Sequence, residues 1–375
     1  MTKIILPYKT IGIIGGGQLG RMMCLAAKAM GYKTAVLDPT PNCPCAQVSD
    51  IEITADYDDM SAIQKLAGLC DVITYEFENI DYKALAYLEE RSYLPQGSDV
   101  LKITQHRYRE KNAISAMGIP VTDFYLINSA ESLKNHFFYP SVIKTTTGGY
   151  DGKGQLVIKS QDDFSAAKKM TEIHECILEK WIRFDKEISV ITARSVNGET
   201  SAFPVAENIH VDNILHQSIV PARISKNLEE KALRYARAIA ENLNIVGVLA
   251  VEMFVSGDDI YINELAPRPH NSGHYTIDAC VTSQFEQHIR AVCGLPLGDT
   301  SLRSPVVMVN ILGEHLDEKN LSNLDPYLPL LANGKLHLYG KAEAKKKRKM
   351  GHLNMLGDIE QSLNAILLTK IWEAR

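Results

Sequence analysis

The feature that most constrains this chain is a regular alternation between residues 10 and about 101. Short apolar runs, IGIIG, TAVLD and DVITYEF, are separated by helical stretches near 21–30 and 60–69. Strands and helices that alternate in this way are typical of βαβ units, in which neighbouring strands pair in parallel. The alternation therefore predicts an α/β region with a parallel sheet at the N-terminus.

Beyond residue 101 the pattern changes from alternation to hairpins. A polar helical stretch near 105–118 ends at Gly118, and the runs SVIKTT and QLVIKS then flank a glycine-rich loop. Strand-like runs between 176 and 266 surround a helix at 228–243, which predicts an α+β region. After Pro296 a small β-rich tail leads to a final helix. We expect domains at 1–103, 104–294 and 295–375, with the middle one divided at about 178 and 179.

Composition excludes several classes of protein. At 375 residues and 45% hydrophobic, the chain is long enough for two or three domains with their own cores. No apolar stretch reaches the roughly 20 residues of a membrane span, and the first apolar run reads as a buried strand rather than a signal peptide. Seven cysteines without a C-x-x-C pattern indicate a reducing cytoplasm.

Charge is distributed unevenly along the chain. The formal net charge of −5 argues against general nucleic-acid binding, which needs a basic surface. Residues 341–349 are nevertheless strongly basic. A run of this kind in an acidic protein is usually a solvated surface.

The first glycine motif, GGGQLG at 15–20, follows a strand and opens a helix. Asp38 ends the next strand about 20 residues later, so the pattern formally matches a dinucleotide-binding fingerprint. The underlying physics is more general, because glycines let a ligand approach the backbone and a helix N-terminus attracts any anion. A phosphorylated substrate fits as well as NAD, and a merely tight turn is the simpler alternative.

The second glycine motif is the loop TTTGGYDGKGQ, which follows Lys144 at the end of a strand. Four glycines in this short loop leave several backbone N–H groups able to point at one target. A Walker loop is excluded, because Lys153 precedes Gly154 instead of a Ser or Thr and a strand follows. A mobile hairpin tip is the alternative, but Lys144 and the acidic residues downstream favour a lid over nucleotide phosphates.

A pair of carboxylates is expected across a later hairpin. The strands around Glu252 and Glu264 flank a turn at SGDD, so they should pair antiparallel. An odd loop centred on Asp258 would place Glu252 opposite Glu264, whereas an even loop would place it opposite Asn263; we expect the odd loop. Facing carboxylates repel unless a cation lies between them, and magnesium prefers such oxygen ligands. Two solvated glutamates are the alternative.

Together these features resemble the ATP-grasp ligases. Five strings narrow the resemblance: GGGQLGRM at 15–22, TYEFENI at 74–80, TTGGYDGKGQ at 146–155, NELAPRPHNSGHYT at 263–276 and RKMGH at 348–352. In this order, and spanning nearly the whole chain, they resemble the 5-(carboxyamino)imidazole ribonucleotide synthases of purine biosynthesis. The resemblance implies a Rossmann-like substrate-binding domain, an ATP-grasp domain with a small lid and a large subdomain, and a small β-rich C-terminal domain.

The resemblance implies a nucleotide site between the two ATP-grasp subdomains. Residues expected around the phosphates are Arg107, Lys144, Gly149, Tyr150, Asp151, Gly152, Lys153, Gly154 and Gln155. The segment Glu179, Lys180, Trp181 and Ile182 would meet the adenine, Glu187 would hold the ribose, and His210 would approach the nucleotide. Glu252 and Glu264, aided by Asn263, would carry Mg²⁺.

The resemblance also implies a site for aminoimidazole ribonucleotide. The substrate would lie against Gly17, Gln18 and Leu19, with its ribose hydroxyls on Glu76 and its base facing Tyr150, Asp151 and Asn271. Lys341 and Arg348 would bind its 5′-phosphate. Members of the family commonly carry Arg-Pro-Gly before that arginine, whereas this chain has Lys345-Lys346-Lys347.

Carboxylation would proceed through carboxyphosphate formed from ATP and bicarbonate, with Lys144 neutralising the transferring group. Arg268, which lies between two prolines, is the expected anchor for bicarbonate, because guanidinium binds oxyanions with two parallel hydrogen bonds. An arginine paired with a nearby carboxylate is the alternative. His270 or Asp151 would take the amine proton, and the sequence does not choose between them.

Other functions stay open on the sequence alone. A second ATP-grasp reaction would activate formate for glycinamide ribonucleotide, and an NAD(P)-dependent oxidoreductase or an idle nucleotide-binding module would use the first βαβ unit. The resemblance further implies a cytoplasmic homodimer that binds neither nucleic acid nor membrane. Its product would pass to the downstream carboxyaminoimidazole ribonucleotide mutase.

Overall fold

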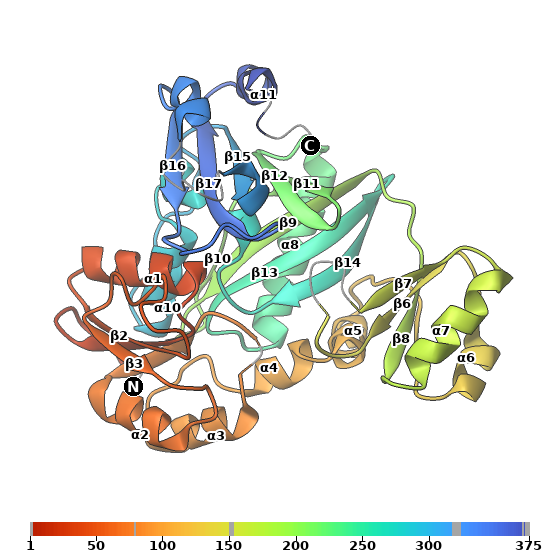
Figure 1. The fold of residues 1–375 in the computed structure, drawn as a ribbon, viewed down its shortest axis with the longest axis horizontal. Coiled ribbons are helices and arrows are strands. Elements are labelled where there is room, and N and C mark those ends of the chain that lie inside the picture. Colours follow the sequence, from red (N-terminus) through yellow and green to blue (C-terminus); the bar gives the residue numbers. More distant parts are fainter. Residues whose placement is uncertain (1–2, 79, 150–153, 317–323, 370, 372–375) are drawn as a thin grey trace.

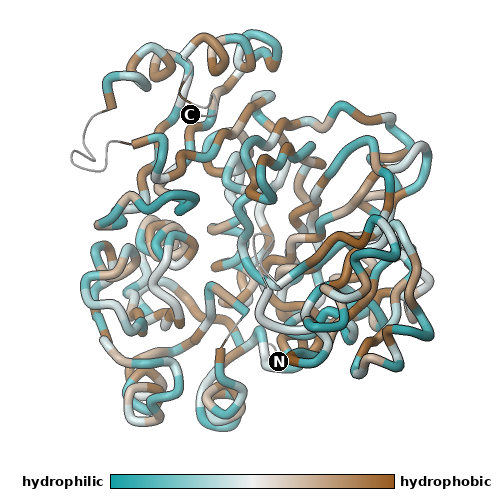
Figure 2. The backbone as a smooth tube through the Cα atoms, turned by 45° about the vertical axis from the view of Figure 1, so that its right-hand side comes forward, coloured by the Kyte–Doolittle hydropathy of each residue, from teal (hydrophilic) through white to brown (hydrophobic). Residues whose placement is uncertain are grey.

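The computed structural model describes residues 3–78, 80–149, 154–316, 324–369 and 371. Figure 1 shows an N-terminal lobe in red and orange, a small yellow-green lobe opposite it, and a larger body from green to blue. Along the tube in Figure 2, hydrophobic stretches concentrate on the inner segments and hydrophilic ones on outer loops and helix faces. No helix among the described residues is both long enough and apolar enough to span a bilayer.

The N-terminal lobe contains the parallel sheet that the alternating pattern predicts. Its strands, in the spatial order β3-β2-β1-β4, are β1 (Thr10–Ile14), β2 (Lys33–Asp38), β3 (Ile51–Thr54) and β4 (Val72–Tyr75). The helices are α1 (Gln18–Ala29), α2 (Met60–Leu69), α3 (Tyr82–Arg91) and α4 (Asp99–Thr104). Because β1 and β4 are parallel neighbours, the loops that follow them meet at one edge of the sheet.

The small lobe is a four-stranded sheet covered by two helices, with a third helix, α5, leading into it. Its elements are α5 (Arg107–Ala116), β5 (Phe124–Ile127), α6 (Ala130–His136), β6 (Ser141–Thr145), β7 (Gln155–Ile158), α7 (Phe164–Thr171) and β8 (Cys176–Lys180). The strand order is β5-β8-β6-β7, with antiparallel pairs. The predicted hairpin is confirmed, because Lys144 pairs with Gln155 across β6 and β7.

The large body is built on a nine-stranded antiparallel sheet. Its strands are β9 (Lys186–Arg194), β10 (Thr200–Ala202), β11 (Ala206–Val211), β12 (Ile214–Val220), β13 (Gly247–Ser256), β14 (Asp259–Ala266), β15 (Val306–Leu312), β16 (Gly334–Leu338) and β17 (Lys349–Leu356). The order is β14-β13-β9-β11-β12-β15-β17-β16, with β10 beside β9. The C-terminal strands therefore extend this sheet across the expected boundary at residues 294 and 295.

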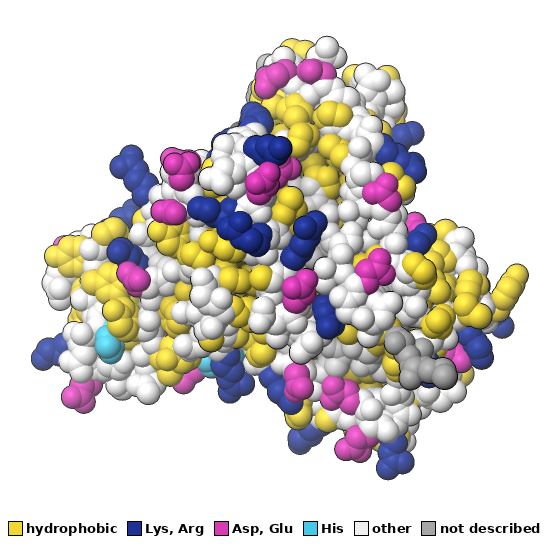
Figure 3. All heavy atoms as spheres, turned by 180° about the vertical axis from the view of Figure 1, so that it is seen from behind, with side chains coloured by type: hydrophobic (Ala, Val, Ile, Leu, Met, Phe, Trp, Pro, Cys, Tyr) yellow, Lys and Arg dark blue, Asp and Glu magenta, His cyan; other side chains and the backbone are white. Residues whose placement is uncertain are grey.

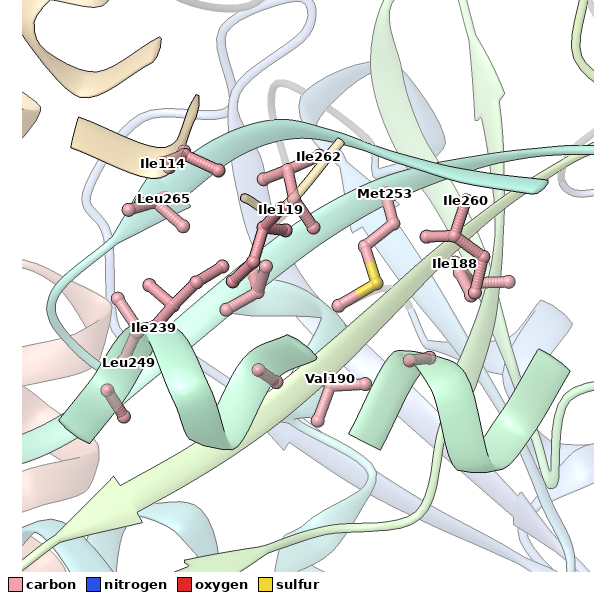
Figure 4. Close-up of a cluster of buried hydrophobic side chains, with 14 of the residues drawn as sticks. Ile114, Ile119, Ile188, Val190, Ile239, Leu249, Met253, Ile260, Ile262 and Leu265 are labelled. Carbon is pink, nitrogen blue, oxygen red and sulfur yellow. The ribbon is translucent and has the colours of Figure 1, made fainter. Parts of the chain in front are cut away.

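Four helices accompany this sheet: α8 (Lys226–Asn242), α9 (Thr276–Ala279), α10 (Gln284–Val292) and α11 (Ile359–Leu368). Helix α8 buries Leu228, Ala232, Ala236 and Ile239, which recur every three or four residues and so form one face. Figure 4 shows the cluster that this face covers, in which side chains from β9, β13 and β14 meet those of α5 and α8. The cluster holds the hairpin that carries Glu252 and Glu264.

A buried chain of hydrogen bonds joins the N-terminal lobe to the large body. The backbone N–H of Val248 donates to Nδ1 of His288 at 3.1 Å, so Nδ1 is the acceptor and Nε2 carries the proton. Nε2 lies 2.7 Å from Oγ1 of Thr74, which in turn donates to Gln96. Both ring nitrogens of His288 are engaged while the imidazole is neutral. Burial disfavours the charged imidazolium and lowers the pKa of His288 to about 3.

We predict that His288 makes stability depend on pH. Below the ordinary histidine pKa of about 6.5, His288 is protonated in the unfolded protein but stays neutral in the folded one. The unfolding free energy therefore decreases as the pH is lowered. The loss attributable to His288 between pH 7 and pH 5 is about 2 kcal/mol. In urea unfolding, His288→Gln should lose less stability than the wild type over this interval, by about that amount. Equal losses in both proteins would contradict the assignment.

Candidate active site

A cavity of about 700 Å³ lies where the three lobes meet. It is lined by most of the residues that the sequence singled out. They are Gly17, Gln18, Leu19, Glu76, Arg107, Lys144, Gly149, Gln155, Glu179, Lys180, Trp181, Ile182, Glu187, His210, Glu252, Asn263, Glu264, Arg268, His270 and Asn271. Figure 3 shows one face of the molecule, on which Lys and Arg side chains gather near the middle with acidic side chains among them.

Some expected residues do not line this cavity. Gly154 closes the β6-β7 hairpin, where its carbonyl accepts from Thr145 N–H at 2.8 Å. Lys341 and Arg348 are also absent from the lining. Tyr150, Asp151, Gly152 and Lys153 lie outside the described residues.

The first glycine loop closes around Glu76. This carboxylate follows β4 and accepts from the backbone N–H groups of Gly17 and Gly20, while burial raises its pKa. Gly15 has a φ of +103°, and a Cβ there would collide with the Glu76 side chain, so the loop requires glycine. Asp38 accepts from Gly16 N–H at 2.7 Å. Asp38, the acidic residue of the formal dinucleotide fingerprint, therefore binds the backbone of the glycine loop itself.

A buried lysine and glutamate cluster lies at the base of the small lobe. Nζ of Lys144 donates to Oε2 of Glu179 at 2.9 Å, and Nζ of Lys111 lies 3.6 Å from the same oxygen. Burial alone would raise the pKa of Glu179, but the two lysines outweigh it and hold the pKa at about 2. Lys111 also donates to the Asn263 carbonyl at 2.9 Å, which ties α5 to β14.

Arg107 bridges the glycine-rich hairpin and the acidic strands. Its Nη2 donates to the Gly149 carbonyl at 3.0 Å, and its Nη1 donates to Oε2 of Glu264 at 3.0 Å. One guanidinium therefore spans from the small lobe to the large sheet. It positions the hairpin opposite the carboxylates.

Glu252 and Glu264 face each other, but not through the loop that we expected. The hairpin turn is even, because Ser256 pairs with Asp259, so the prediction of an odd loop centred on Asp258 is wrong. A register shift between Glu252 and Met253 then restores the pairing of Glu252 with Glu264 and leaves Asn263 without a partner in the β13-β14 register. A β-bulge adds one residue to one strand, which compensates for the even loop.

The facing carboxylates are electrostatically strained in the protein alone. Burial and the nearby Glu264 raise the pKa of Glu252 to about 8. His270 accepts from Ser272 N–H through Nδ1, so Nε2 carries its proton toward Glu252 at 3.1 Å. No group of three or more His, Cys, Asp or Glu suited to a metal occurs among the described residues. Two facing carboxylates that line a cavity nevertheless fit magnesium, which takes its remaining ligands from water or from a bound anion.

The far end of the cavity is flat and aromatic. Phe184 and Phe254 stack with their centroids 4.6 Å apart, and both line the cavity beside Trp181. Nδ1 of His210 lies 3.1 Å from Glu187, whose negative charge outweighs burial and raises the pKa of the histidine. An apolar slot next to a polar pair suits a nucleoside.

Arg268 is held by a carboxylate. Its Nε and Nη2 donate to the two oxygens of Glu78, at 2.5 and 3.2 Å. The arginine is thus paired as in the alternative that we weighed, and Glu78 was not identified from the sequence. Asn271 is engaged in a similar way, because its side-chain amide makes two hydrogen bonds with that of Asn310.

The basic run folds into a turn beside the glycine loop. Nζ of Lys341 donates to the Lys349 carbonyl at 2.7 Å, and burial together with nearby positive charge lowers the pKa of Lys341 to about 8. Lys347 has a φ of +65°. A side chain in this left-handed conformation costs about 1 kcal/mol, so the turn carries a small backbone strain at lysine.

Sequence reasoning missed other residues of the site. Lys111, Phe184 and Phe254 were not singled out from the sequence, although Lys111 lies in a stretch expected to be helical and Phe254 in one expected to be a strand. Helical position alone gave no sign of burial at Lys111. A signal did exist for the phenylalanines, since both follow segments already assigned to the nucleotide site.

Family models match three successive parts of the chain. They are the ribonucleotide synthetase preATP-grasp domain at residues 8–105, the ATP-grasp domain at 112–285 and the phosphoribosylaminoimidazole carboxylase C-terminal domain at 306–365. The chain is 56% identical to the N5-carboxyaminoimidazole ribonucleotide synthase of Bacillus subtilis (strain 168) over 358 residues, which cover 94% of this chain and 93% of that protein.

Solved structures agree along the whole chain. An ADP complex of an N5-carboxyaminoimidazole ribonucleotide synthetase superposes with a TM-score of 0.95 and 62% identity, covering 100% of this chain and 99% of that one. The Aspergillus clavatus N5-carboxyaminoimidazole synthase, solved with ADP and 5-aminoimidazole ribonucleotide, has a TM-score of 0.89 and 31% identity, covering 97% of this chain and 98% of that one.

We predict that Glu179→Gln destabilises the protein strongly, because it leaves two buried ammonium groups without a counter-charge. The unfolding free energy in urea should fall by about 3 to 5 kcal/mol. Glu175→Gln is the matched control, since Glu175 pairs with His106 at 2.9 Å but its side chain is 44% exposed. Its loss should stay below about 1 kcal/mol. Similar losses in the two variants would show that the buried cluster does not need this charge.

Proposed function

The chain belongs to the N5-carboxyaminoimidazole ribonucleotide synthase family, and we propose that its cavity carries out the ATP-dependent carboxylation of 5-aminoimidazole ribonucleotide. It is an ATP-dependent ligase of purine biosynthesis. The observation that carries the assignment to this cavity is the convergence of Lys144 and Gly149 of the small lobe on Glu252 and Glu264 of the large sheet. Phosphate-binding cations and metal-binding carboxylates thereby face one space.

The nucleotide would lie along the cavity from the aromatic slot at Phe184 and Phe254 to the glycine-rich hairpin that follows Lys144. Its adenine would enter beside Trp181 and Phe184, and its ribose would reach Glu187. The triphosphate would then pass Lys144 and Arg107, which exchange their carboxylate partners for phosphate oxygens. In support, these groups all line the same cavity, and the relative solved with ADP superposes over the full chain.

Magnesium would be held by Glu252 and Glu264. In support, burial and the neighbouring Glu264 raise the pKa of Glu252, and a divalent cation held by these residues would favour both carboxylates as anions. When bound, the ion would offset the negative charge of the transferring phosphoryl group. His270 would keep Glu252 in place through its Nε2–H.

The chemistry overcomes two poor reactants. Bicarbonate is a weak electrophile, and the ring delocalises the lone pair of the aminoimidazole amine. A bicarbonate oxygen attacks the γ-phosphorus of ATP, the bond to the bridging oxygen breaks, and ADP and carboxyphosphate result. Carboxyphosphate then breaks its bond between carbon and the bridging oxygen, releasing phosphate and CO₂. The amine adds to the carbon of CO₂ and loses a proton. The protein positions these groups and stabilises charge.

Arg268 would anchor bicarbonate and then carboxyphosphate, since its Nε and Nη2 present two parallel donors. Of the two candidate bases, His270 has both ring nitrogens near protein groups, Ser272 and Glu252. That engagement favours Asp151 as the acceptor of the amine proton. Closure of the hairpin over the site would protect carboxyphosphate from water.

The imidazole substrate would bind against Gly17, Gln18 and Leu19, with Glu76 on its ribose hydroxyls and Asn271 near its base. Lys341 and Arg348 would hold its 5′-phosphate. In support, a positive Lys341 and the carboxylate of Glu76 are close enough to influence each other electrostatically. The relative solved with 5-aminoimidazole ribonucleotide shares the fold throughout.

We also propose that the enzyme works as a cytoplasmic homodimer and hands its product to the downstream mutase. The N-terminal segment exposes apolar side chains at alternate positions, Ile4, Leu6 and Tyr8. This exposure supports a partner surface there. The instability of a carbamate in water supports a direct transfer of product.

We predict that ADP release requires Mg²⁺ and bicarbonate and rises at least about tenfold when 5-aminoimidazole ribonucleotide is added. Coupled spectrophotometric detection of ADP measures this. An unstimulated rate would contradict the carboxylation, as would stimulation only by formate with glycinamide ribonucleotide.

We predict that Arg348→Ala raises the KM for the imidazole ribonucleotide by about tenfold to a hundredfold, the loss expected for one charged hydrogen bond to phosphate. The KM for ATP should change less than about twofold. Lys345→Ala is the control, because Lys345 is exposed and pairs with Glu343 at 2.8 Å, so both constants should stay near wild type. Equal effects of Arg348→Ala on the two substrates would contradict the phosphate assignment.

A further inference from the structure

Arg268 presents its paired donors to Glu78 in the manner in which guanidinium groups bind small oxyanions. Nε and Nη2 reach the two carboxylate oxygens at 2.5 and 3.2 Å, while Nη1 donates to the Pro269 carbonyl. Burial would raise the pKa of Glu78, but Arg268 outweighs it and keeps the carboxylate ionised. Both residues line the cavity. The oxyanion-binding edge of Arg268 is therefore covered by an anion of the protein itself.

Glu78 lies on the same short segment as Glu76, the residue that we propose for the substrate ribose. One residue separates the two glutamates, and both follow β4. The backbone carbonyl of Glu78 accepts from Nε2 of Gln105 at 2.5 Å. Gln105 lies between α4 and α5, so the Glu78 end of this segment is tethered to the part of the chain that leads into Arg107.

We propose that Glu78 is a gate residue that occupies the bicarbonate-binding edge of Arg268 until the imidazole ribonucleotide engages the neighbouring Glu76. This inference rests on the proposed function. In the empty enzyme, bicarbonate has to displace an intramolecular carboxylate of the same charge and nearly the same geometry. When the substrate ribose draws Glu76 and its segment, the Glu78 carboxylate withdraws and Arg268 accepts bicarbonate.

Such a gate prevents wasteful turnover of ATP. Bicarbonate bound without the amine acceptor would still take the γ-phosphoryl group and give ADP and carboxyphosphate. With no amine present, carboxyphosphate would break down to CO₂ and phosphate, and the net result would be hydrolysis of ATP. An anion that holds Arg268 until the acceptor is bound links the first chemical step to the presence of both substrates.

The test removes the competing charge and keeps the shape of the side chain. For Glu78→Gln we expect the KM for bicarbonate to fall by about fivefold, the ratio expected for loss of a partly exposed ion pair. We expect ADP release in the absence of imidazole ribonucleotide, at fixed ATP, Mg²⁺ and bicarbonate, to rise by a similar factor. The KM for ATP should stay near wild type, and thermal unfolding should confirm that the variant is folded.

Glu286→Gln is the matched control. Glu286 also pairs with an arginine, Arg290, at 2.7 Å, and its side chain is 32% exposed, as is that of Glu78. It lies on α10 and does not line the cavity. The KM for bicarbonate and the ADP release without imidazole ribonucleotide should both be unchanged in this variant. Glu78→Asp is the second variant, in which one hydrogen bond to Arg268 is weakened. Its bicarbonate KM and its ADP release without imidazole ribonucleotide should change in the same direction as in Glu78→Gln, by a smaller factor.

The outcomes separate this inference from the proposed function. Unchanged bicarbonate KM and unchanged basal ADP release in Glu78→Gln would overturn the gate. A raised bicarbonate KM would overturn it too, because Glu78 would then position Arg268 rather than compete at it. If Glu78→Gln does not fold, the same two measurements on Glu78→Asp decide. Failure of the wild type itself to respond to imidazole ribonucleotide would instead reject the proposed function.

Discussion

The structure depends on pairing the cations Lys144, Arg107 and Arg268 of the cavity with carboxylates. Lys144 is held by Glu179, and Arg107 is held by Glu264. A buried charge without a partner costs several kcal/mol, so these cations need a counter-charge from the protein itself. The carboxylates supply that counter-charge. In the function that we propose, binding of a phosphate would exchange one anion for another.

The same pairs explain how the lobes are assembled. Arg107 on α5 reaches Glu264 on β14, and Arg268 beyond β14 reaches Glu78 beyond β4, so both contacts cross between lobes. They lie at the ends of regular elements, where a side chain can face a cavity without disturbing a hydrophobic core. Strand pairing and helix packing set these positions, and the ion pairs then set the distances between lobes.

Local sequence patterns predicted most of the fold, because alternation and hairpin signals depend on near neighbours. The pairing of Glu252 with Glu264 was also correct, but its stated reason was not. The turn is even, and a bulge after Glu252 corrects the register. Bulges depend on packing across the sheet, which no local pattern shows. The partners Lys111 and Glu78 escaped notice for the same reason, since each is defined by a residue distant in sequence. At Lys347 the backbone has a left-handed φ of +65°, which a run of three lysines in the sequence did not indicate.

The central claim is that this cavity transfers the γ-phosphoryl group of ATP to bicarbonate. Turnover with ¹⁸O-labelled bicarbonate, followed by mass analysis of the released phosphate, tests it directly. The oxygen of bicarbonate that attacks phosphorus leaves with it, so one labelled oxygen per phosphate is predicted when imidazole ribonucleotide is present. Unlabelled phosphate would mean that water attacks ATP, and it would contradict the account.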